Sequence, residues 1–105
     1  VHVPRNWRKA VNAIHDADGV VVKASDEAIL DAMRLAGRHG VFAEPAAAAS
    51  LAAVVSAIES KTIGPHDRVL VMVTGSGLKD PEIASRLSPE PIPVAPDPDA
   101  IAAAA

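Results

Sequence analysis

The segment VLVMVTGSGLKDP, residues 69–81, carries the side chains best suited to chemistry. Five apolar residues in a row, 69–73, are followed by the hydroxyl of Thr74 and by two glycines, Gly75 and Gly77. Such an apolar run is typical of a strand buried on both faces of a parallel sheet. In open α/β sheets, ligands bind beyond the carboxyl ends of the strands, and glycines let the backbone approach them closely. The segment therefore predicts a ligand-binding loop.

Spacing alone leaves an alternative open for this loop. It matches neither nucleotide-binding consensus, because no third glycine follows Gly77 at the required distance and Lys79 lacks the spacing of a P-loop lysine. A tight turn between a strand and a helix would need the same glycines. Both interpretations stand until other residues are considered.

Two charged side chains near glycine or proline have a chemical and a structural interpretation. Glu44, just before Pro45, could orient a substrate or transfer a proton, but a carboxylate there also suits the start of a helix. Lys79 invites a Schiff-base role, which needs a lowered pKa. The neighbouring Asp80 argues against that, so we expect a solvated or salt-bridged structural lysine.

The elements that must position these residues alternate between helix and strand. Helices are predicted from Asn6 to about Gly19, from Ser25 to Gly40, from Pro45 onward and from Pro81 to Leu87, with strands at residues 20–22 and 69–73. The second helix shows an apolar stripe of Ile29, Met33 and Ala36. This order of elements is an α/β signature.

The helix that begins at Pro45 carries two kinds of apolar face. One face, of large residues, must be covered by a partner; the other is small enough for a close approach of another element or a ligand to the backbone. The large face consists of Leu51, Val54, Val55 and Ile58, and the small face of Ala47, Ala48, Ala52 and Ala53.

The chain divides into two regions of different composition. We expect residues 1–87 to form an α/β domain, whereas residues 88–105 hold prolines at a spacing that blocks both helix and interior strand. We expect an extended, largely disordered Pro/Ala-rich tail there.

Composition excludes several classes of function. The formal net charge of -3 comes without a basic block, so no nucleic-acid partner is expected. Cysteine is absent, and the histidines lack metal-ligand spacing, so we expect neither disulfides nor a metal site. The longest uncharged stretch, residues 45–58, is too short to span a bilayer, and no signal peptide is visible. We expect a cytoplasmic protein with no membrane partner.

Two segments together, EPAAAAS (44–50) and TGSGLKDP (74–81), resemble the threonine synthase family of pyridoxal-phosphate (PLP) enzymes. The resemblance extends more weakly over residues 4–10 and 25–32, and only the tail lies outside it. It implies a tryptophan synthase β-like α/β fold, with parallel strands and flanking helices, of which this chain forms the C-terminal portion. It also implies PLP as cofactor and the conversion of O-phosphohomoserine and water to threonine and phosphate.

The resemblance further implies which residues meet the cofactor. Thr74 matches the hydroxyl residue that faces the pyridine nitrogen, and Gly75 and Gly77 let the loop pass close to the ring. A neutral hydroxyl does not hold that nitrogen protonated, which disfavours transamination and leaves eliminations accessible. The chain departs from the family at Ala47, where a second hydroxyl residue is common, and at Ser76, where a histidine is frequent. These departures concern substrate specificity.

No residue of the chain is assigned a catalytic role. Nothing in it matches the family's Schiff-base lysine or its glycine-rich phosphate cradle. We therefore expect the chain alone to be inactive, to bind PLP weakly if at all, and to act on an amino-acid substrate only with the N-terminal part of the enzyme, or else to self-associate. The alternatives are a serine or threonine dehydratase-like fragment, which GLKDP disfavours, and a non-catalytic binding or oligomerisation module that kept the fold.

Overall fold

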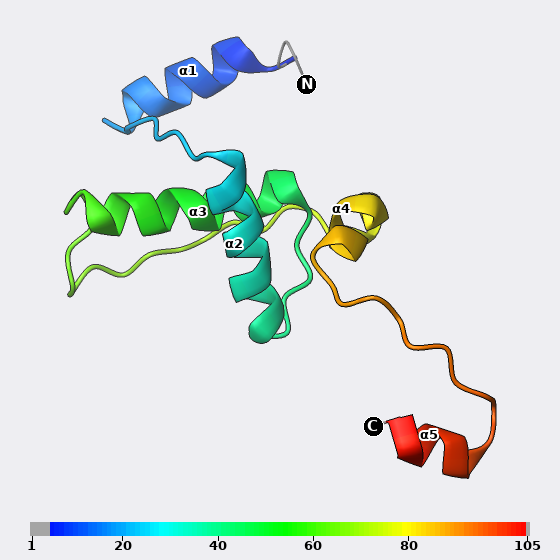
Figure 1. The fold of residues 1–105 in the computed structure, drawn as a ribbon. Helices are drawn as coiled ribbons and strands as arrows, with labels where there is room; N and C mark the ends of the chain where they lie inside the picture. The colour runs from blue at the N-terminus through cyan, green and yellow to red at the C-terminus, as the bar shows by residue number, and fades with distance from the viewer. Residues whose placement is uncertain (1–4, 105) are drawn as a thin grey trace.

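The computed structural model describes residues 5–104, which are mainly helical (Figure 1). Each predicted helix is present, and a short 3-10 helix precedes α4. In chain order the elements are α1 (Trp7–Asp16), α2 (Asp26–Arg38), α3 (Pro45–Glu59), the 3-10 helix η1 (Gly77–Lys79), α4 (Pro81–Arg86) and α5 (Pro98–Ala104).

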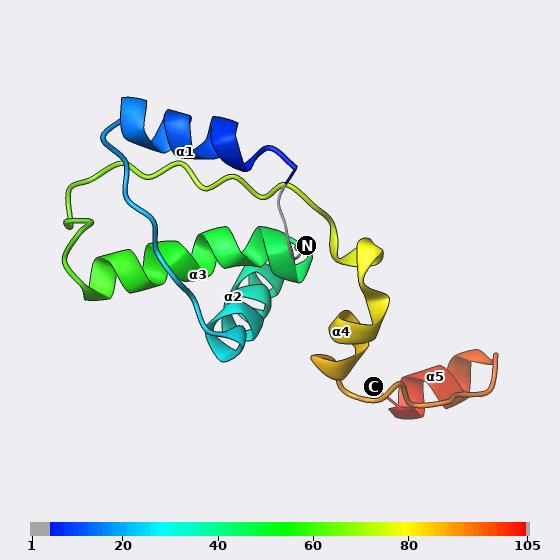
Figure 2. The ribbon, with the colours of Figure 1, turned by 90° about the horizontal axis from the view of Figure 1, so that it is seen from above.

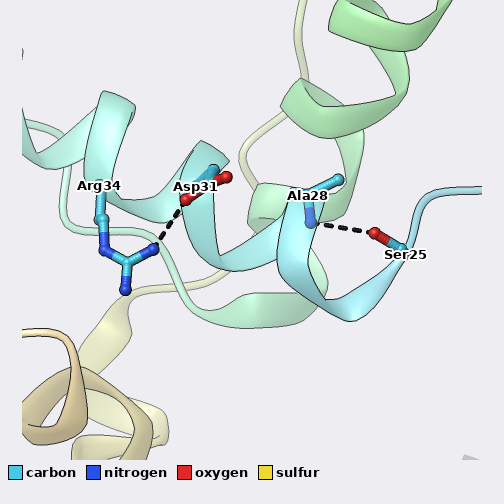
Figure 3. A network of polar contacts seen from close by, with 4 residues as sticks. All are labelled: Ser25, Ala28, Asp31 and Arg34. Atoms are coloured by element: carbon cyan, nitrogen blue, oxygen red, sulfur yellow. Dashed lines mark hydrogen bonds and ion pairs between the residues drawn. The ribbon is translucent and has the colours of Figure 1, made fainter.

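The ends of α2 follow from the residues at its boundaries. The Ser25 hydroxyl accepts a hydrogen bond from the backbone N–H of Ala28 at 3.1 Å, which satisfies a donor of the first turn (Figure 3). One turn on, Arg34 donates to the Asp31 carboxylate at 2.7 Å on the exposed side of the helix. Gly40, with φ of 77°, ends the segment in the left-handed region that glycine tolerates. Ser25 as the cap and Gly40 as the stop agree with the predicted helix from Ser25 to Gly40.

The core lies where α3 crosses α2, and small side chains make most of it. Ala47 and Ala48 of α3 are each 1% exposed, and they pack with Ala32 and Met33 of α2. The prediction that the alanine face permits a close approach is confirmed. Within the large face, Leu51 and Val54 are half-buried, whereas Val55 and Ile58 remain exposed. That a partner covers this face stays a prediction. The neighbouring helix meets the alanines instead, because they let the two backbones come close.

Neither predicted strand forms a ladder within residues 5–104. Residues 20–22 and 69–73 make no backbone hydrogen bond to another backbone group there, although both run extended. The second segment returns along α3 (Figures 1 and 2). A strand needs a neighbour with free N–H and C=O groups, and the described chain offers none at these positions. The parallel sheet therefore stays a prediction.

The helix α1 is amphipathic in sequence but has no buried residue in the structure. Trp7 and Val11 are 49% and 55% exposed, and Ile14 is half-buried. The Arg8 guanidinium lies over the indole ring of Trp7, 5.3 Å from the ring centroid.

No helix in residues 5–104 combines the length and apolar character that crossing a bilayer requires.

The tail contains a helix that the prolines were expected to exclude. Pro98 begins α5, and the Asp97 carboxylate accepts hydrogen bonds from the backbone N–H groups of Asp99 and Ala100 at 3.0 and 3.2 Å. The expectation is wrong for these residues because proline is tolerated in a first helical turn and alanines follow it. The division into residues 1–87 and a disordered tail of residues 88–105 stays a prediction.

Replacing Ala48 by Leu tests the close packing of α3 on α2. We expect Ala48→Leu to lower the free energy of unfolding by about 1 to 3 kcal/mol, because the added methylenes meet a filled contact. The matched control is Ala46→Leu on the exposed side of the same helix, which should cost less than about 0.5 kcal/mol. Thermal unfolding followed by far-UV circular dichroism measures both. Equal shifts would contradict the packing described.

Candidate functional site

The loop predicted to bind a ligand lies against the start of α3. The backbone N–H of Glu44 donates to the carbonyl of Gly75, and the N–H of Gly77 donates to the carbonyl of Phe42, both at 3.0 Å. These bonds frame an antiparallel bridge between Ala43 and Ser76. Figure 1 shows the chain passing the N-terminal end of α3 just before α4. Two segments far apart in sequence therefore form one structural unit.

The two glycines of the loop lie directly against side chains of the opposing segment. A Cβ at position 75 would overlap the Glu44 carboxylate, and one at position 77 would overlap the Phe42 ring, with Cδ2 and Cζ at 2.6 Å. Backbone and side chain could not both keep their places with alanine there. The glycines thus let the loop approach α3, a role that the sequence analysis did not consider.

Glu44 and Lys79 form an ion pair across the loop. The Lys79 ammonium Nζ lies 3.7 Å from Glu44 Oε1, with the glutamate side chain 18% exposed and the lysine side chain 64% exposed. The expectation of a salt-bridged lysine agrees with this contact, but its partner is Glu44 rather than the neighbouring Asp80. The Asp80 carboxylate instead accepts from the backbone N–H of Ile83 at 3.3 Å and caps α4.

Ser50 connects the extended segment to α3, a role that its place in the sequence does not indicate. Its Oγ lies 2.7 Å from the Ala47 carbonyl oxygen and 3.1 Å from that of Met72, so its proton serves both acceptors. The second contact joins two positions that are distant in sequence. A lone hydroxyl after four alanines was the available signal, but it does not indicate a partner.

Thr74 sits between these anchors with its own side chain free. It is exposed, and its hydroxyl makes no hydrogen bond to the described residues 5–104. Met72 is held on one side by Ser50, and Gly75 on the other by Glu44. The structure thus presents the Thr74 hydroxyl on a loop held on both sides, with an ion pair alongside it, whereas the Ser76 hydroxyl accepts from the backbone N–H of Leu78 at 3.3 Å. The predicted site residues Thr74, Gly75 and Gly77 stay proposals.

Comparison with known proteins identifies related sequences. The family model described as pyridoxal-phosphate dependent enzyme matches residues 1–75. The threonine synthase of Mycobacterium bovis is 43% identical over 99 residues, which cover 93% of this chain and 28% of that protein. The threonine synthase of Methanocaldococcus jannaschii is 40% identical over 92 residues, covering 87% and 23%. That of a Bacillus species is 46% identical over 82 residues, covering 77% and 23%. The chain spans about a quarter of the length of these relatives.

Alanine at Gly77 in the loop, compared with alanine at Gly37 in α2, tests the contact between the loop and Phe42. We expect Gly77→Ala to lower the free energy of unfolding by about 1 to 3 kcal/mol, because the new Cβ overlaps the Phe42 ring. Gly37→Ala is the control: position 37 is helical with nothing within 4 Å of an added Cβ, so alanine should stabilise by about 0.5 to 1 kcal/mol. Urea unfolding measures the change in the free energy of unfolding for both variants. A decrease for Gly77→Ala with an increase for Gly37→Ala would support the packing, and an increase for Gly77→Ala would contradict it.

Proposed function

Because the chain belongs to the family of pyridoxal-phosphate dependent enzymes, we propose that it supplies the pyridine-nitrogen wall of the cofactor site in a threonine synthase-like lyase. Such an enzyme converts O-phosphohomoserine and water to threonine and phosphate. The observation that carries the proposal is the Thr74 hydroxyl, which is exposed and free of hydrogen bonds to the described residues. Met72 and Gly75, on either side of Thr74, are hydrogen-bonded to Ser50 and Glu44.

The described residues fit one side of the cofactor. Thr74 offers an O–H donor to a pyridine nitrogen, and its neutral side chain cannot hold that nitrogen protonated. PLP, when bound, supplies an electron sink for the bonds at the substrate's α-carbon. Because Thr74 leaves that sink weak, it favours elimination and replacement of phosphate over transamination. Gly75 and Gly77 contribute backbone that can lie close to the ring, since neither has a side chain to intervene.

The rest of the site must come from other residues. Nothing in the chain resembles a phosphate cradle, and Lys79 pairs with Glu44, so we assign the Schiff-base lysine to a different segment of the enzyme. That segment, or a second copy of the chain, is the proposed partner, and an amino-acid substrate is the proposed ligand. In the assembled enzyme residues 20–22 and residues 69–73 each form a strand of a parallel sheet. A cytoplasmic location belongs to the same proposal.

A non-catalytic binding or oligomerisation module is the second candidate. The observation in its favour is apolar exposure: Leu70 is 85% exposed, Val21 77% and Val20 70%. Exposed apolar surface of this kind marks an interface. A module would self-associate but would not restore activity when combined with a lysine-bearing segment. The next two experiments separate the candidates.

Substitution of Thr74 tests its proposed role in an enzyme assembled from this chain and the N-terminal part of a related threonine synthase. Thr74→Asp should hold the ring nitrogen protonated and open transamination, whereas Thr74→Val should mainly weaken PLP binding. Threonine and phosphate released from O-phosphohomoserine are measured beside keto acid. Wild-type turnover by Thr74→Asp, with no keto acid formed, would remove Thr74 from the pyridine position.

Borohydride reduction in the presence of PLP tests the assignment of Lys79 on the chain alone. We expect no stoichiometric adduct at Lys79, because its side chain is 64% exposed and paired with a carboxylate, and so lacks the apolar pocket or neighbouring cation that activates a Schiff-base lysine. Mass spectrometry of the reduced chain locates any adduct. A one-to-one adduct at Lys79 that a substrate analogue displaces would show that this lysine is the Schiff-base residue.

A further inference from the structure

We infer that Glu44 is a positioning residue for Thr74, and that Lys79 keeps the Glu44 carboxylate in place. The inference rests on the proposed function, because it matters for chemistry only if Thr74 meets the cofactor. It assigns no contact with substrate or cofactor to Glu44. Three features of the structure support it: the backbone of Glu44, the space its side chain fills, and its charge.

The backbone of Glu44 connects the loop to α3 in both directions. Its carbonyl accepts from the N–H groups of Ala47 and Ala48 at 3.0 and 2.9 Å and so begins the helix. Its N–H donates to the Gly75 carbonyl at 3.0 Å, directly after Thr74. Ala47 and Ala48 are themselves buried against α2. Glu44 therefore links the position of Gly75 directly to the helix packing, beside the contacts of Gly77 with Phe42 and of Met72 with Ser50.

The side chain of Glu44 occupies the space that a Cβ at position 75 would need. An added Cβ would overlap the carboxylate and lie 2.9 Å from Cγ of Glu44. No positive φ is recorded for Gly75, so its backbone alone does not demand glycine. The glutamate side chain folds over the glycine, so a larger residue at position 75 would have to displace that side chain. Glu44 thereby restricts the loop from the side as well as through its backbone.

The charge of Glu44 explains the contact with Lys79. A carboxylate with a side chain only 18% exposed has lost much of its water, which is unfavourable unless an opposite charge is near. Lys79 Nζ is the basic group within 4 Å of it among the described residues, at 3.7 Å. Lys79 follows the loop on η1, so Glu44 contacts the chain on both sides of Ser76 and Gly77. The pair therefore limits the positions that the loop can adopt.

A double-mutant cycle on the 105-residue chain tests the steric link. Gly75→Ala should speed amide hydrogen exchange at Gly77, because displacing the Glu44 side chain loosens the loop. In a Glu44→Ala background the obstructing carboxylate is gone, so Gly75→Ala should have an effect at least about threefold smaller, as expected for residues in contact. Equal effects of Gly75→Ala in both backgrounds would overturn the inference.

The assembled enzyme tests whether the link reaches the cofactor. Glu44→Gln and Lys79→Met should each raise the dissociation constant of PLP and lower kcat about tenfold, and the double variant should be no worse than either one, because both remove the same pair. Lys23→Met and Glu90→Gln, which remove charges outside this pair, are the controls and should leave both values unchanged. Additive losses, or unchanged values for Glu44→Gln, would overturn the inference.

Comparison with Thr74→Val separates this inference from the proposed function. If Gly75 and Glu44 are coupled but Thr74→Val leaves PLP binding unchanged, the proposed function fails while Glu44 still positions the loop. If Thr74→Val weakens PLP binding and Glu44 shows no coupling to Gly75 or Lys79, Thr74 keeps its role and Glu44 is not its positioning residue.

Discussion

The close contact of α3 with α2 determines where the remaining parts of the structure lie. Ala47, Ala48 and Ala52 are almost fully buried there, and larger side chains at these positions would hold the two backbones apart. The contact also fixes Ala43, which is 2% exposed and immediately precedes Glu44. The helix packing thus determines the position of Glu44, and Glu44 and Phe42 together determine the position of the glycine loop. The position of Thr74 depends on that series of contacts.

Local features of the structure could be predicted from the sequence because their causes are local. Ser25 as a cap, Gly40 as a stop and proline as the first residue of α3 and α4 each depend on a few neighbouring residues. The sequence indicated that the alanine face of α3 permits a close approach, but not that α2 is the element that packs there. Large side chains suggest burial on hydrophobicity alone, but the face that is buried depends on the shape of the element that meets it.

The candidate site was predictable only in part. The glycines and the hydroxyl of Thr74 indicated a loop, whereas the contacts that hold it join positions some thirty residues apart in the chain, as between Glu44 and Gly75. Neither the ion pair of Glu44 with Lys79 nor the hydrogen bond of Ser50 to Met72 has a sequence signature. The α5 helix was missed for a different reason, because a proline that ends one kind of structure can begin another.

The exposure of residues 69–73 bears on the sheet proposed for the assembled enzyme. Leu70 and Met72 are 85% and 65% exposed, whereas Val69 and Val73 are 45% and 44% exposed, so exposure alternates with the period of a strand. Val71 and Val73 border a hollow with Leu51 of α3. Val71 and Val73 therefore face the same hollow as α3, and the backbone N–H and C=O groups of the segment have no backbone partners in residues 5–104. A neighbouring strand would satisfy those groups, and a further layer over Leu70 and Met72 would bury the second face, which is the environment that five consecutive apolar residues indicate.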